Sequence, residues 1–100
     1  MPFDQRIPRR FTPDAINMYA PVTSGVYGIS NSREWIYIGE TDNIQGSLLA
    51  HLRDHRTTLM KREPTGFVFE ICDQSIRSSR QGQLVGEYVP ACNGSPARQL

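Results

Sequence analysis

The sequence predicts a small α/β domain of the α+β kind, with a central three-stranded, mainly antiparallel sheet flanked by helices. Three short segments are rich in β-branched and aromatic residues, which favour strands. Two other segments repeat apolar residues at helical spacing. The chain has 100 residues, of which 38% are hydrophobic, and this suffices for one domain with one modest core.

Residues 1–22 are expected to form an N-terminal arm and one short helix. Thr12 has the side chain of a helix N-cap and precedes Pro13, a residue that the first helical position tolerates. The spacing predicts a helix over 13–19, stopped by Pro21. The apolar face expected to cover the sheet consists of Ile16, Met18 and Tyr19.

The strands are expected at 26–30, 34–38 and 67–72. The first two are separated by Asn31-Ser32-Arg33, whose side chains favour a turn, so they are predicted to pair as an antiparallel hairpin. The third alternates bulky apolar residues and follows a segment containing proline and glycine.

Two further helices complete the predicted domain, which spans residues 23–93 and precedes a flexible tail at 94–100. Asp42 or Asn43 can cap the first of these helices, in which Ile44, Leu48 and Leu52 recur every four residues. Beside that stripe, a second column contains Ser47, His51 and His55. The last helix is expected over 78–88, with Leu84 and Val85 as its buried positions.

Charge and composition limit the function classes. Eleven Lys and Arg against ten Asp and Glu leave a net charge of +1, so any nucleic-acid binding has to come from a local patch. The candidate patches are the N-terminal arginines Arg6, Arg9 and Arg10, the segment 53–62, and Arg77 with Arg80, although each is also typical of ordinary solvated surface. From these, Arg53, Arg56 and Arg80 are the residues expected to bind nucleic acid. The two cysteines, Cys72 and Cys92, fit no zinc motif; one bridge between them stays open.

The location expected from the sequence is cytoplasmic, with no membrane association. No apolar run approaches the roughly 20 residues that cross a bilayer. The N-terminal residues also lack the basic-then-apolar layout of a secretory signal.

Several short motifs and single residues occur in an order that is fairly specific as a set. Together they resemble the signature of the GIY-YIG nuclease family, over residues 24–93. The resemblance implies the family's small α+β fold for the predicted domain. It rests on Gly25-Val26-Tyr27, Tyr37-Ile38-Gly39, Asn43, His51, Leu84-Val85, Pro90 and Asn93.

The resemblance implies a nuclease site at Tyr27, Tyr37, His51 and Asn93. In active members of the family, the tyrosines and histidine handle proton transfer and water activation at a phosphodiester. A glutamate holds one divalent ion, and an arginine stabilises the phosphate in the transition state. These groups are needed because water is a poor nucleophile and negative charge develops on the phosphoryl and leaving oxygens.

Two of the family's positions depart from its pattern. Counting from Asn43 and His51 puts Ser47 at the arginine position, and counting back from Asn93 puts Gln81 at the glutamate position. Serine has no cationic fork, and a glutamine carbonyl is a poor sole ligand for Mg²⁺. Loss of such an arginine costs on the order of 10³ to 10⁵ in the rate of phosphoryl transfer.

The leading interpretation is therefore a nuclease fold that is inactive or strongly impaired, with weak nucleic-acid binding and no cofactor. One alternative is an active DNA endonuclease with a rearranged site that uses Mg²⁺ or Mn²⁺, for which Glu40 is a weak candidate ligand. Another is a protein-interaction module on a nuclease scaffold, with a protein partner or a homodimer. Its contacts are expected from arm residues Phe3, Ile7 and Phe11.

Single residues also have plainer interpretations. Without the resemblance, Tyr27 and Tyr37 are ordinary half-buried strand aromatics, and Asn93 is a helix-end cap. Two histidines four residues apart, His51 and His55, can bind zinc from one helix face, but no third ligand is evident.

Overall fold

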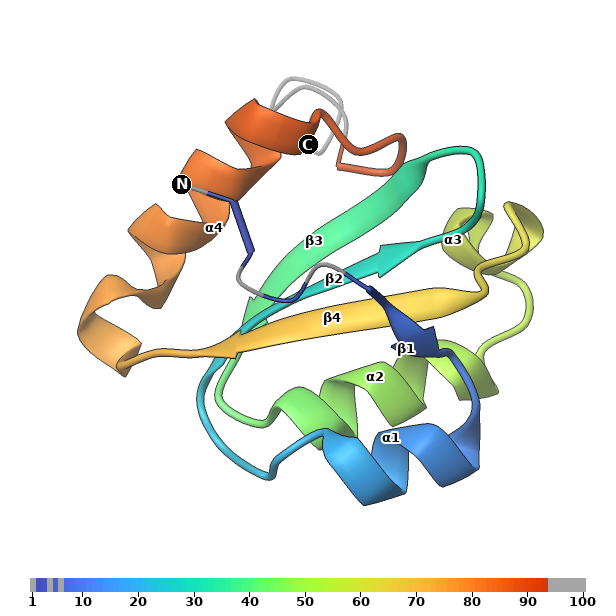
Figure 1. Ribbon diagram of the computed structural model, residues 1–100, viewed down its shortest axis with the longest axis horizontal. Helices are drawn as coiled ribbons and strands as arrows, with labels where there is room; N and C mark the ends of the chain where they lie inside the picture. Colours follow the sequence, from blue (N-terminus) through green and yellow to red (C-terminus); the bar gives the residue numbers. More distant parts are fainter. Residues whose placement is uncertain (1, 4, 6, 94–100) are drawn as a thin grey trace.

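A computed structural model describes residues 2–3, 5 and 7–93 of the chain. The predicted tail at 94–100 lies outside the described residues. Four strands and four helices follow one another along the described chain (Figure 1). Their order is β1 Arg9–Arg10, α1 Pro13–Tyr19, β2 Gly25–Ser30, β3 Trp35–Thr41, α2 Ile44–Arg53, α3 Thr58–Lys61, β4 Gly66–Ile71 and α4 Gln74–Tyr88.

The sheet has the strand order β1-β4-β2-β3, and each pair of neighbours is antiparallel. The predicted α+β class is confirmed, but the sheet has four strands rather than three. The additional strand β1 pairs Arg9 with Phe67 and Arg10 with Gly66. The two arginines pair through their backbone groups and their side chains are exposed, so the sequence has no apolar alternation that would indicate a strand here.

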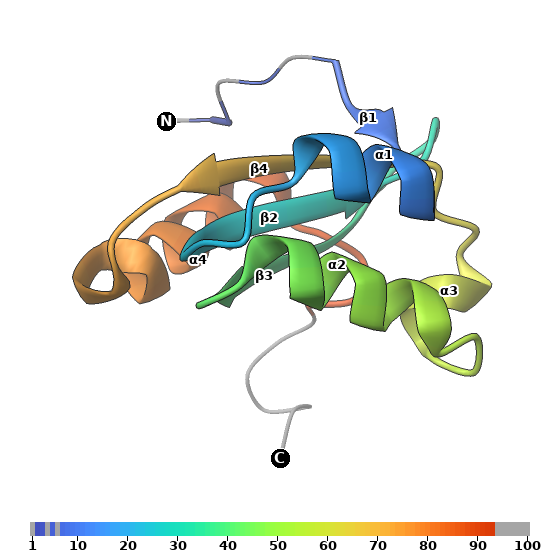
Figure 2. The same cartoon turned by 90° about the horizontal axis from the view of Figure 1, so that it is seen from below.

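The helices lie on both faces of the sheet, so the domain has three layers (Figures 1 and 2). Helices α1 and α2 cover one face, where Ile16, Ile44 and Leu48 are fully buried. Helix α4 covers the other face, where Leu84 packs with Val26, Ile38 and Val68. Alternation along β2 and β3 sends neighbouring side chains to opposite layers, which puts Tyr27 and Tyr37 on the side of α2.

Local capping explains where two helices begin. The Thr12 hydroxyl accepts from the backbone N–H of Ala15 at 3.2 Å, and Asn43 Oδ1 accepts from that of Gly46 at 2.9 Å. Both predicted caps are therefore confirmed, with Asn43 and not Asp42 in that role. Helix α2 ends at Arg53, so His55 does not continue the column of Ser47 and His51.

The N-terminal arm is part of the core. Phe3 is only 5% exposed and stacks on Trp35 and Tyr88, with ring centroids 6.0 and 5.9 Å away. Phe11 is buried against the α1 and α2 layer, whereas Ile7 is exposed. Two of the three residues expected to anchor a partner are thus used inside the domain.

Helix α1 buries less than its sequence predicted. Only Ile16 of its expected apolar face is buried, while Met18 and Tyr19 are exposed. The Tyr19 ring instead lies 3.9 Å from the guanidinium carbon of Arg9, a cation–π contact on the surface. Across the described residues, no helix has the length and apolar character that crossing a membrane requires.

Candidate functional site

Tyr27, Tyr37 and His51 form one aromatic cluster between the sheet and α2. The Tyr27 hydroxyl lies 2.8 Å from Nε2 of His51. The Tyr37 ring centroid is 6.1 Å from that of Tyr27 and 5.4 Å from that of His51. Residues from β2, β3 and α2, up to 24 positions apart, therefore meet at one place.

Gly39 makes this meeting sterically feasible. It pairs with Tyr27 across the β2–β3 ladder. A Cβ atom at position 39 would lie 2.6 Å from both Cζ and the hydroxyl of Tyr27 and 2.8 Å from Cε2 of Tyr37. The last glycine of the second motif thus leaves the volume that the Tyr27 side chain fills.

Burial keeps all three side chains neutral near pH 7. Burial, and then the neighbouring Tyr37, raise the pKa of Tyr27 above its ordinary value. Burial, and then the Glu40 carboxylate, raise the pKa of Tyr37, while burial lowers that of His51. With His51 protonated on Nδ1, the Tyr27 hydroxyl donates to Nε2.

Ser47 is tied into the entrance of α2. Its hydroxyl donates to Oγ1 of Thr41 at 2.7 Å, and the same Oγ1 accepts from the backbone N–H of Asn43 at 3.0 Å. These contacts join the end of β3 to the first turn of the helix. At the position where the resemblance implies an arginine, the domain has a structural hydroxyl pair.

Gln81 and Asn93 both bind the backbone of Ile38 in β3. The Gln81 amide donates to the Ile38 carbonyl at 3.0 Å. Asn93 donates to the same carbonyl at 2.9 Å and accepts from the Ile38 N–H at 2.8 Å. The segment before Asn93 continues this pairing, because Ala91 donates to the Trp35 carbonyl and Cys92 to that of Ile36.

Glu40 lies at the exposed end of β3 and has a cationic partner. Arg77 Nε donates to Glu40 Oε1 at 2.7 Å, and Arg77 Nη1 donates to the Ser24 hydroxyl at 3.1 Å. The sequence indicated Arg77 only as part of a basic patch with Arg80; its contact with Glu40 was not anticipated because the last helix was expected to start at residue 78, whereas α4 begins at Gln74. The available signal was the four-residue spacing that puts Arg77 on the same helix face as Gln81.

These residues do not fit a divalent metal ion. Within residues 2–3, 5 and 7–93, no three His, Cys, Asp or Glu side chains gather as a ligand set. Gln81 turns its amide nitrogen to the backbone, and Glu40 is paired with Arg77. Mg²⁺ is held in proteins mainly by carboxylate oxygens, and the cluster offers none of them unpaired.

The predicted nucleic-acid-binding arginines differ in their surroundings. Arg80 forms two contacts of 2.8 Å with the Glu70 carboxylate, through Nε and Nη2, and its side chain is only 15% exposed. Arg56 is 95% exposed and lies 3.9 Å from Asp54. Arg53 is exposed at the rim of a mainly apolar cavity of about 540 Å³ beside α1 and α2.

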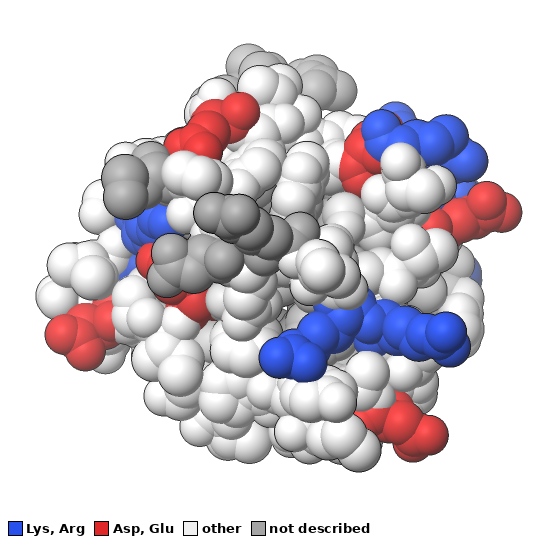
Figure 3. Space-filling model, viewed as in Figure 1, with Lys and Arg blue, Asp and Glu red and all other residues white. Residues whose placement is uncertain are grey.

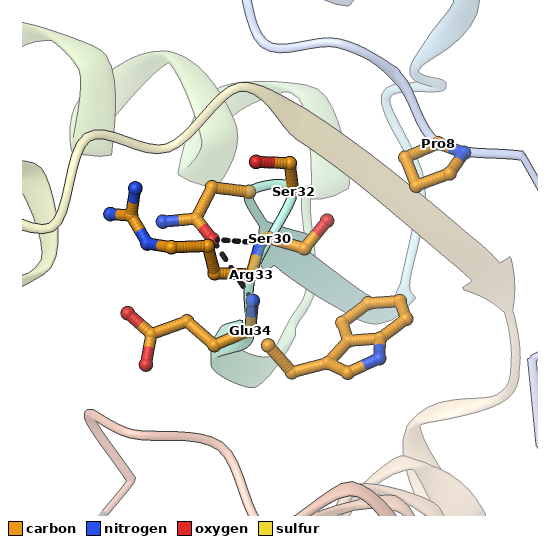
Figure 4. Close-up of a pocket in the computed structure, with 7 residues that line it drawn as sticks. Pro8, Ser30, Ser32, Arg33 and Glu34 are labelled. Atoms are coloured by element: carbon orange, nitrogen blue, oxygen red, sulfur yellow. Dashed lines mark hydrogen bonds between the residues drawn. The ribbon is translucent and has the colours of Figure 1, made fainter.

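Two further surface features lie away from the cluster. Figure 3 shows a basic strip at the position of β1, whose two arginines are exposed. A cavity of about 310 Å³ lies at the turn between β2 and β3, where Asn31 Oδ1 accepts from the N–H groups of Arg33 and Glu34 (Figure 4). None of its lining residues belongs to the aromatic cluster.

Comparison with known proteins identifies the class of fold. No family model and no curated protein sequence matches the chain. Solved structures of the GIY-YIG N-terminal endonuclease domain of UvrC from Thermotoga maritima do match it. A tyrosine point mutant bound to the catalytic divalent cation has a TM-score of 0.68 and 20% identity, and the match covers 80% of this chain and 96% of that one.

The magnesium-bound form of the same domain has a TM-score of 0.64 and 21% identity, and here the match covers 76% of this chain and 92% of that one. The chain therefore has a GIY-YIG-like fold, as its motifs indicated. Identity this low establishes the fold and leaves the chemistry to be argued from the residues.

Proposed function

We propose that this chain is a GIY-YIG-like domain that has lost phosphodiester hydrolysis and binds nucleic acid weakly through the aromatic cluster of Tyr27, Tyr37 and His51. One observation carries the proposal. Tyr27, Tyr37 and His51 are assembled, whereas Ser47 and Gln81 use their hydrogen bonds inside the domain. The proton-transfer groups thus persist without the groups that stabilise charge.

The missing charges matter more for this reaction than the retained aromatic groups. Phosphoryl transfer needs cations at the phosphoryl and leaving oxygens, and an arginine there is worth about 10³ to 10⁵ in rate. A serine hydroxyl that already donates to Thr41 supplies no positive charge. Neutral Tyr27 and His51 can pass a proton but cannot replace that charge.

The same cluster retains features that suit binding. Neither the Tyr37 hydroxyl nor Nδ1 of His51 has a hydrogen-bond partner among the described residues. Half-buried aromatic rings offer faces on which bases stack, at about 1–3 kcal/mol per base in single-strand binders. With a net charge of +1, we expect dissociation constants of about 10⁻⁴ to 10⁻⁶ M at physiological salt.

The activity test is cleavage of supercoiled plasmid, single strands and branched DNA with Mg²⁺ or Mn²⁺, run beside Tyr27→Phe. We expect no cleavage by either protein, and traces from the double variant Ser47→Arg with Gln81→Glu. Cleavage by the wild type that disappears in Tyr27→Phe would contradict the proposal.

The binding test uses a fluorescent single strand at low salt with EDTA present. Tyr37→Ala is expected to weaken binding about tenfold, because it removes one stacking face and one hydroxyl. Tyr19→Ala is the matched control, since Tyr19 is an exposed tyrosine on α1 outside the cluster. Equal affinities of the two variants would place binding elsewhere on the surface.

A further inference from the structure

Arg77 brings a guanidinium to the end of β3, where the sequence motifs place no cation. We propose that Arg77 is a phosphate-binding residue at the edge strand β3, beside the aromatic cluster, and that Glu40 is an internal anion with which the bound phosphate competes. This inference rests on the proposed function, because its ligand is a backbone phosphate of the same nucleic acid. It adds that a protein cation, and no divalent ion, contacts that phosphate.

The hydrogen bonds of Arg77 leave part of its guanidinium available. Of its five N–H donors, one on Nε binds Glu40 and one on Nη1 binds Ser24. Nη2 has no partner among the described residues. The side chain is 17% exposed, so it is held in place and still reaches solvent. A planar, fixed guanidinium with spare donors matches the geometry of a phosphate.

The position of Arg77 connects it to the aromatic cluster. Glu40 follows Tyr37 by three residues in β3, which corresponds to about 10 Å of strand. The Glu40 carboxylate acts on Tyr37, since it contributes to the raised pKa of that phenol. One turn after Arg77, Gln81 reaches the Ile38 carbonyl from the same helix. Arg77 lies on the α4 face of the sheet and the aromatic cluster on the α2 face, on the two sides of the edge strand β3. A strand of nucleic acid that passes around this edge would contact both.

Glu40 is the anionic partner of Arg77 in the free domain. In the free domain, its carboxylate offsets the charge of Arg77. An incoming phosphate is a second anion at the same guanidinium, so Glu40 opposes binding. If the ion pair were purely structural, removal of either partner would change the stability of the fold and leave nucleic-acid binding unchanged.

The test measures binding of a fluorescent single strand with EDTA present, over a series of salt concentrations, to Arg77→Gln and Glu40→Gln. Arg77→Gln is expected to weaken binding about tenfold. It should also reduce the slope of log K against log salt by about 0.7, the value for one phosphate contact in a single strand. Glu40→Gln is expected to tighten binding about two- to fivefold, because the competing anion is gone.

Arg62→Gln is the matched control, because Arg62 pairs with Glu34 at 3.1 Å near the distant β2–β3 turn. Thermal unfolding verifies that each variant is folded. Arg77→Lys provides a second test, because it keeps the positive charge and loses the paired N–H donors of the guanidinium. The salt slope should therefore equal that of the wild type, while the affinity falls.

The outcomes separate this inference from the proposed function. Binding that depends on Tyr37 but responds equally to Arg77→Gln and Arg62→Gln would overturn the role of Arg77 and leave the proposed function standing. Weaker binding by Glu40→Gln would overturn the role of Glu40 as a competitor. Absence of wild-type binding at low salt would overturn both proposals.

Discussion

Asn93 pairs with Ile38 as a neighbouring strand would: its side-chain amide accepts from the Ile38 N–H at 2.8 Å and donates to the Ile38 carbonyl at 2.9 Å. Strand β3 is at an edge of the sheet, and Asn93 is only 6% exposed. The amide thereby satisfies backbone groups that would otherwise be unpaired at a buried edge.

Replacement of Asn93 by alanine should therefore destabilise the domain. An unpaired buried N–H costs about 1–3 kcal/mol, and we expect Asn93→Ala to lower the free energy of unfolding by that amount in a urea titration. Gln81→Ala is the control: the Ile38 carbonyl keeps its bond from Asn93, so the loss should be smaller. A larger effect of Gln81→Ala would contradict this assignment.

Replacement of glycine by alanine should have opposite effects on stability at positions 39 and 82. Gly39→Ala would put a methyl group 2.6 Å from Tyr27, and overpacking of this kind costs about 1–3 kcal/mol. At Gly82, inside α4, a Cβ meets nothing within 4 Å. Gly82→Ala should stabilise the protein by about 0.5–1 kcal/mol. Thermal unfolding of both variants measures the contrast, and a stabilising Gly39→Ala would show that the cluster is loosely packed.

Local chemistry made much of the fold predictable. The caps Thr12 and Asn43 and the turn at Asn31 act within three residues of their partners, so their sequence signals are direct. Residues far apart are harder to connect. Arg77 and Glu40 are 37 positions apart, and no local pattern links an exposed glutamate to a helix that starts earlier than expected.

In the candidate site, too, some contacts could be predicted from the sequence and others could not. The register of β2 and β3 follows from their alternation, so the meeting of Tyr27 and Tyr37 could be anticipated. The partners of Ser47 and Gln81 could not be, because a hydroxyl or an amide finds one of many backbone or side-chain groups only once the chain has folded.

His51 should make stability depend on pH. Burial lowers its pKa in the folded state below the value of 6.5 expected when unfolded. Between these two pKa values, the unfolded chain binds more protons than the folded one. The contribution of His51 to the free energy of unfolding is therefore fully present above pH 6.5 and is lost as pH falls through the folded pKa. Urea titrations of wild type and His51→Gln at pH 7.5, 6.5 and 5.5 check this. We expect the wild type to lose more stability than the variant, and parallel losses would rule out His51 as the cause.

Val89 has a backbone conformation that suits glycine. It caps the C-terminus of α4 with φ 48° and ψ 63°, and its N–H donates to the Val85 carbonyl at 2.8 Å. A β-branched residue in this left-handed region is strained by about 1–2 kcal/mol. The side chain is 78% exposed, so its removal sacrifices little packing.

Val89→Gly should therefore raise the free energy of unfolding by about 0.5–1 kcal/mol, after subtraction of the extra freedom that glycine gains in the unfolded chain. For a domain of this size, that gain corresponds to about 2–8 °C in thermal midpoint. Val89→Ala keeps a Cβ in the left-handed region and should gain less. If the glycine variant melts at or below the wild-type temperature, Val89 is not strained at this cap.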